Sequence, residues 1–122
     1  MASGERQECT LNIEIREELR SLVPPLAPDE FSQLERSILA EGCRDALVTW
    51  NGILLDGHHR LEICRKHDLP FQTVEIDLPD ELVAKEWIIR NQFARRNLTP
   101  FQRVELALRY QDIIRARAKQ KQ

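Results

Sequence analysis

The segment ILLDGHHRLEIC places five residues that could do chemistry in succession: Asp56, Gly57, His58, His59 and Arg60. Such side chains serve as metal ligands, catalytic bases or phosphate contacts. Neighbouring helical residues point about 100° apart, so His58 and His59 do not share one face as a chelating pair does. No further His or Cys lies at ligand spacing from them, and we therefore expect no metal site.

We expect a strand to end at Leu55 and a helix to begin near His58, with Gly57 in the turn between them. A glycine there allows a phosphate to approach the backbone closely. The free N–H groups and the dipole of a helix N-terminus favour an anion, and Arg60 in the first turn adds a bidentate contact. The segment therefore predicts an anion site. The alternative is an ordinary helix start with polar first-turn residues.

Two other segments carry candidate residues. NQFARRNLTP places Arg95 and Arg96 just before the last expected helix. They form either a surface linker or a clamp on phosphates bound at Gly57. AEGCRD places Gly42 at the end of an expected helix, where by itself it indicates only a C-terminal turn.

The elements that must position these residues follow from the hydrophobic pattern and the turn signals. The pattern predicts strand 11–15, a helix from Pro28 to Gly42, a hairpin over ALVTWNGILLDG, helix 58–67, strand 71–76, helix 79–92 and helix 100–117. Asn51-Gly52 tolerates the positive φ angles of a type I′ hairpin turn. Thr99 and Gln102 form a capping box with proline at the first helical position.

These elements define an α+β domain with a small mixed β-sheet, a β-hairpin packed against helices, and C-terminal helices. The domain is expected to span residues 11–118, with a basic C-terminal helix from 100, a disordered N-terminal tail at 1–10 and a short tail at 119–122. The residues expected to face the core are Phe31, Leu34, Ile38, Leu61, Cys64, Val83, Ala84, Trp87 and Ile88.

The charge of the chain is unevenly distributed. Residues 1–89 hold 9 Lys/Arg and 18 Asp/Glu, a net of −9, whereas residues 90–122 hold 9 Lys/Arg and 2 Asp/Glu, a net of +7. A basic C-terminal third indicates an anionic ligand or DNA, or else a solvated basic helix. The three widely spaced cysteines fit a reducing cytoplasm, and no apolar run of about 18 residues predicts a membrane span.

Three motifs, SILAEGCRDALVTW, GILLDGHHRLEIC and RRNLTPFQ, resemble the N-terminal domain of the ParB/sulfiredoxin-like superfamily in order and spacing. The resemblance covers about residues 11–118. It implies a ParB-like module that binds a nucleotide, such as CTP, ATP or ADP, with or without Mg²⁺. It also implies a homodimer and control of self-association or of DNA contact through the basic C-terminal third, as in partition or transcription regulation. No helix-turn-helix follows residue 118, so specific operator binding is not expected of this chain.

The resemblance assigns roles residue by residue. Gly42 matches a glycine close to the base, Gly57 and Arg60 match the phosphate motif, and Arg95 with its neighbour Arg96 matches the third motif, also expected near phosphates.

The chain departs from the ParB pattern at several of these positions. Asp45-Ala46 stands where Gln-Pro is usual, and His58 and His59 replace Glu and Arg. Asn91 and Gln92 occupy the places of a Glu and an Asn, which removes a carboxylate linked to Mg²⁺.

Two alternatives remain open. The free serine kinases of the superfamily have an Asp-Gly-x-His-Arg-like motif, which implies an ATP- or ADP-dependent phosphotransferase. In that reading His58 or His59 contacts the substrate or a phosphate, Asp56 orients the acceptor, and Glu30 or Glu41 is the base. The second alternative is a ligand-free interaction domain. Sulfiredoxins place a nucleophilic cysteine about where His59 stands, and Cys64 is expected to be a core residue instead.

Overall fold

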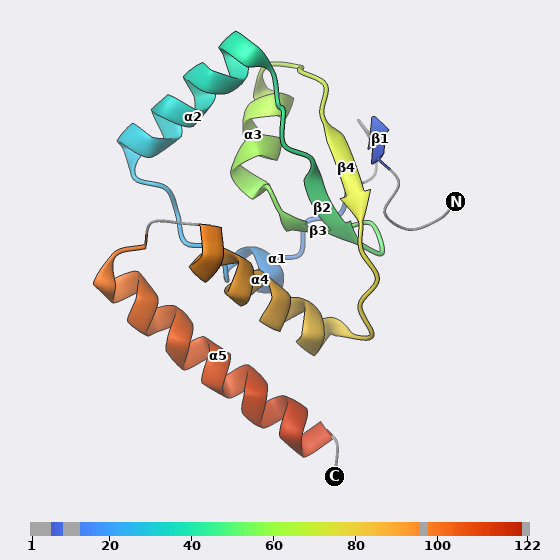
Figure 1. The fold of residues 1–122 in the computed structure, drawn as a ribbon, viewed down its shortest axis with the longest axis vertical. Helices are drawn as coiled ribbons and strands as arrows, with labels where there is room; N and C mark the ends of the chain where they lie inside the picture. Colours follow the sequence, from blue (N-terminus) through green and yellow to red (C-terminus); the bar gives the residue numbers. More distant parts are fainter. Residues whose placement is uncertain (1–5, 9–12, 96–97, 121–122) are drawn as a thin grey trace.

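The structure is a computed structural model that describes residues 6–8, 13–95 and 98–120. The elements in chain order are β1 (Arg6–Glu8), α1 (Glu17–Arg20), α2 (Pro28–Glu41), β2 (Leu47–Trp50), β3 (Ile53–Asp56), α3 (His58–Lys66), β4 (Gln72–Glu75), α4 (Glu81–Arg95) and α5 (Pro100–Gln120) (Figure 1). The strand order is β1-β4-β2-β3. Because β2 pairs parallel with β4 and antiparallel with β3, the sheet is mixed, as predicted.

The β2–β3 hairpin turns at Asn51 and Gly52, as the sequence predicts. Their φ angles are +52° and +77°, the positive pair of a type I′ turn. Glu75, at the end of the parallel neighbour β4, anchors this turn: its carboxylate accepts hydrogen bonds from the Thr49 hydroxyl at 2.8 Å, from the Gly52 N–H at 3.3 Å and from the Asn51 N–H. A side chain far along the sequence therefore stabilises a turn that is otherwise local.

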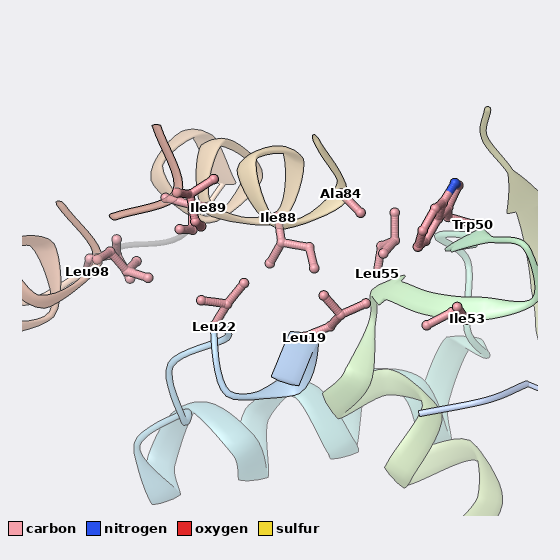
Figure 2. Packing of buried hydrophobic residues seen from close by; sticks show 11 residues of the cluster. Leu19, Leu22, Trp50, Ile53, Leu55, Ala84, Ile88, Ile89 and Leu98 are labelled. Carbon is pink, nitrogen blue, oxygen red and sulfur yellow. The ribbon is translucent and has the colours of Figure 1, made fainter. Parts of the chain in front are cut away.

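Helices cover the central strands from both sides, because successive side chains of β3 point to opposite faces. Leu54 packs with Leu47 in a cluster built mainly by α2, α3 and the two hairpin strands, whose other buried members are Ile38, Leu61, Ile63, Cys64 and Phe71. Ile53 and Leu55 pack in a second cluster with α1, α4 and α5, shown in Figure 2. Most of the predicted core residues are buried in these clusters or pack against them.

Helix α5 runs alongside α4, with Leu106 and Ile113 buried in the second cluster (Figure 1). Its predicted capping box is present: the Gln102 N–H donates to the Thr99 hydroxyl at 3.1 Å, and the Thr99 N–H donates to the Gln102 side-chain oxygen at 3.0 Å. The large apolar side chains that α5 leaves exposed are Phe101, Val104, Leu108 and Ile114. None of the helices in the described ranges is long and apolar enough to cross a membrane.

The N-terminal region differs from the prediction. Of the expected strand 11–15, residues 11 and 12 lie outside the described residues, and Glu14 forms only an isolated bridge to Ile53. Residues 6–8, expected in the tail, pair with β4 as β1. The unpredicted helix α1 is four residues long, too short to show helical periodicity, and is held by Leu19, which is fully buried.

Replacement of Glu75 by Ala should lower the free energy of unfolding by about 2–3 kcal/mol, because three donors at the hairpin lose a charged acceptor. Urea unfolding followed by circular dichroism measures the change. Glu105→Ala, at an exposed position of α5, is the control and should stay within about 0.5 kcal/mol of the parent. Equal effects of the two substitutions would contradict the anchoring role of Glu75.

Candidate functional site

A cavity of about 240 Å³ lies where the end of β3 meets α3 and α4. Seven residues singled out from the sequence line it: Asp56, Gly57, His58, His59, Arg60, Asn91 and Gln92. The structure thus brings the glycine turn together with two residues of α4 that follow it by more than 30 positions. The remaining wall is formed by Val23, Leu26, Leu34 and Asp45.

Gly57 holds the turn between β3 and α3 in a left-handed conformation, with φ +106° and ψ 23°. A Cβ at this position would lie 2.4 Å from the Leu47 Cδ2 atom, so the fold itself demands glycine. No side chain caps α3, and the residues of its first turn line the cavity. The N-terminal N–H groups and the dipole of the helix would favour an anion at this position.

Arg60 is already engaged by carboxylates. Its guanidinium pairs with the Asp56 carboxylate at 3.2 Å and, less closely, with that of Asp45 at 3.7 Å, and it also donates to the Asp45 carbonyl. The side chains of Arg60 and Asp56 are only 12% and 11% exposed, so removal of either partner would leave a largely buried charge uncompensated. An anion in the cavity would have to share Arg60 with Asp56.

His58 is a buried, uncharged polar residue in the cavity wall. It is 8% exposed, and neither ring nitrogen has a hydrogen-bond partner. Burial lowers the pKa of His58 to about 4. The nearby charges of Arg20 and His59 act in the same direction, whereas the Asp56 carboxylate acts in the opposite one. At neutral pH the imidazole therefore offers one donor and one acceptor but no charge.

Gln92 contributes a second unpartnered group. It is 4% exposed, and its side-chain oxygen has no hydrogen-bond partner. A buried polar atom without a partner costs about 1–3 kcal/mol, and native proteins keep few of them. Two such residues in the wall of one cavity are the feature expected of a binding site.

His59 faces a different environment from His58. One of its ring nitrogens lies 3.5 Å from the Pro24 carbonyl oxygen, and its ring meets Phe31 edge-on at 6.4 Å between centroids. It therefore links the proline-rich segment between α1 and α2 (residues 21–27), and α2 itself, to the start of α3.

Several predicted site residues lie away from the cavity. Gly42 ends α2 with φ +81° but does not line the cavity. The Glu30 carboxylate accepts the Ala27 N–H at the start of α2, and Glu41 pairs with Arg44 at 3.2 Å, so neither candidate base faces the cavity.

The remaining candidates concern arginine, cysteine and metal chemistry. Arg95 is the last residue of α4, and Arg96 lies outside the described residues. Cys64 is completely buried, as expected of a core residue, and burial with the nearby Cys43 raises its pKa to about 12. Within the described part of the chain, no group of three or more His, Cys, Asp or Glu side chains could hold a metal ion.

Four residues of the wall were not predicted as site residues from the sequence. Asp45 had a signal, since it stands where the ParB pattern has Gln. Val23, Leu26 and Leu34 had none, because they reach the cavity only through the packing of the proline-rich segment and α2.

The chain shares its fold with ParB N-terminal domains. The chain superposes on two solved structures, the C2221 form of a Pnob8-like ParB-N domain and a pNOB8-like ParB N-domain, each with a TM-score of 0.74. The identities are 22% and 24%, over 99% of this chain and 49% and 47% of those chains. The chain therefore spans about half the length of these structures, and the likeness establishes the fold. No protein-family model and no curated protein sequence matches it.

Gly57→Ala should lower the free energy of unfolding by about 3 kcal/mol or more, because strain at positive φ adds to the clash with Leu47. Gly52→Ala is the matched control: its φ is also positive, but open space surrounds the new Cβ, and we expect a loss of about 1 kcal/mol. Chemical denaturation measures both. Equal losses would show that Leu47 does not constrain the turn.

His58 should make the protein acid-sensitive. The pKa of His58 is about 4 in the folded protein and about 6.5 in the unfolded chain, so the unfolded chain takes up the proton first as the pH falls. The stability that neutral His58 contributes is therefore fully present above pH 6.5. The free energy of unfolding then decreases by up to about 1.4 kcal/mol per pH unit as the pH falls towards 4. His58→Gln should flatten this decline between pH 6.5 and 5. Denaturation at several pH values measures the slope, and NMR titration of the imidazole is the check. A midpoint near 6.5 in the folded protein would contradict the burial effect.

Proposed function

We propose that this chain is a ParB-like regulatory module that binds a nucleotide in the cavity at Gly57. The observation that carries the proposal is the pair of buried, unpartnered polar groups on His58 and Gln92, two residues that line the same cavity as the uncapped start of α3. A ligand with both hydrogen-bond donors and acceptors would satisfy these groups, and its phosphates would meet the helix N-terminus.

The charge of the cavity limits how the phosphates bind. Asp45 and Asp56 outnumber Arg60 among the charged groups of the wall, with His58 neutral. Additional positive charge would therefore come from Mg²⁺ bound with the nucleotide and, as the resemblance implies, from Arg95 and Arg96. A cavity of about 240 Å³ is smaller than the ~300–1,000 Å³ of typical ligand pockets, so a whole nucleotide would extend beyond it.

The proposed output is carried by α4 and α5. Asn91 and Gln92 belong to the last turns of α4, so a ligand that contacts them biases the connection to α5. On its outer side α5 exposes Phe101, Val104 and Leu108, spaced along one helical face. Nucleotide binding would thereby control self-association into a homodimer, or contact of the basic C-terminal third with DNA, in partition or transcription regulation.

The kinase alternative has less support in the cavity. Its two candidate bases, Glu30 and Glu41, hold the start of α2 and an exposed ion pair, respectively. The carboxylates that do line the cavity, Asp45 and Asp56, are both paired with Arg60. We therefore favour binding over phosphotransfer.

Isothermal titration of the full chain with CTP, ATP and ADP, each with and without Mg²⁺, tests the proposal. At least one nucleotide should bind, and Gln92→Met should weaken it about tenfold or more, because the substitution removes a buried acceptor while keeping the volume. The same variant should be at least as stable as the parent, since the unpartnered oxygen is gone.

Gln33→Met, at an exposed position of α2 away from the cavity, is the control and should leave the affinity unchanged. Light scattering with and without the bound nucleotide then reports self-association. Absence of binding at millimolar concentrations of all three nucleotides, or full affinity in Gln92→Met, would overturn the proposal.

A further inference from the structure

A second cavity, also of about 240 Å³, lies on the other side of His58. It is lined by Ile15 and Arg20, before and at the end of α1, and by His58, Leu61, Glu62 and Arg65 of α3. The four α3 residues follow the i, i+3, i+4, i+7 spacing of one helical face. Of this face, the proposed nucleotide site uses only His58, which borders both cavities.

The charged side chains that line this second cavity carry a net positive charge, and no ion pair within the described part of the chain involves them. Arg20 and Arg65 are exposed, and neither forms an ion pair among the described residues. Arg20 lies close enough to His58 for its charge to oppose protonation of the imidazole. Glu62 is the one carboxylate of the lining, so the cavity carries a net charge of +1 with His58 neutral.

His58 supplies the observation that points to a ligand. Its imidazole is more than nine-tenths buried, yet neither nitrogen is satisfied by the protein. A neutral imidazole N–H donates well to an anionic oxygen, and two guanidinium groups offer charge-assisted hydrogen bonds to the same kind of group. Ile15 and Leu61 provide an apolar surface beside these donors.

From this arrangement we propose that the cavity between residues 15–20 and α3 binds a small organic anion, a carboxylate or phosphate carried on a short apolar group. The acid oxygens lie between Arg20 and Arg65 with His58 as a neutral donor, and the apolar group covers Ile15 and Leu61. Glu62 favours the singly charged carboxylate over the phosphate, which is close to doubly charged at neutral pH. The site shares only His58 with the proposed nucleotide cavity, and binding here does not require a nucleotide.

Proton–nitrogen NMR titration of the full chain in the absence of nucleotide tests this site with hexanoate, hexyl phosphate and inorganic phosphate as probes. Hexanoate or hexyl phosphate should shift the signals of Arg20, Arg65 and the His58 ring in a saturable way. Whichever of hexanoate and hexyl phosphate binds more tightly identifies the acid group that the cavity prefers. Arg20→Gln and Arg65→Gln should each weaken this binding about tenfold, the effect of losing a charge-assisted hydrogen bond.

Arg44→Gln is the matched control, because Arg44 is an exposed arginine paired with Glu41 outside the cavity, and it should leave the affinity unchanged. Hexanol tests whether the apolar surface suffices by itself. Equal binding of hexanol and hexanoate, undiminished binding in both cavity variants, or no saturable shift at 20 mM of any acid probe (roughly a −2 kcal/mol limit) would overturn the proposal.

Discussion

The left-handed turn at Gly57 is the constraint on which the site depends. Leu47 of β2 fills the space where a Cβ would project, so the chain must leave β3 and enter α3 through a glycine in this one conformation. The turn determines which way α3 faces. It places His59 and Arg60 at the cavity proposed to bind a nucleotide, directs the Leu61 face towards the second cavity, and leaves His58 between the two.

The site is built at a cost to stability. His58 and Gln92 are buried without partners, and the Asp56–Arg60 pair is largely withdrawn from water. The rest of the domain offsets this cost through two apolar clusters, on either side of the central strands, and through the Glu75 anchor at the hairpin. Unsatisfied groups concentrated in one region of an otherwise well-packed domain are typical of a surface kept for a ligand.

Elements with a strong local signal were predicted correctly. The Asn51-Gly52 turn and the Thr99–Gln102 capping box are specified by residues that are neighbours in the sequence, so both could be predicted from the sequence. Strand β1 and helix α1 were missed because each is held by a distant partner: β1 pairs with β4, and Leu19 packs against the second cluster. The resemblance to ParB N-terminal domains was confirmed at the level of the fold.

The sequence by itself determined the order of the main elements and most residues of the candidate site, because glycine turns, helix starts and apolar periodicity are local properties of the chain. Only the tertiary structure decided the charge state and the partners of those residues. Burial keeps His58 neutral, Asp56 and Asp45 occupy Arg60, and Gln92 reaches the cavity without a partner. These properties depend on which segments meet in space, and they cannot be predicted from the spacing of residues along the chain.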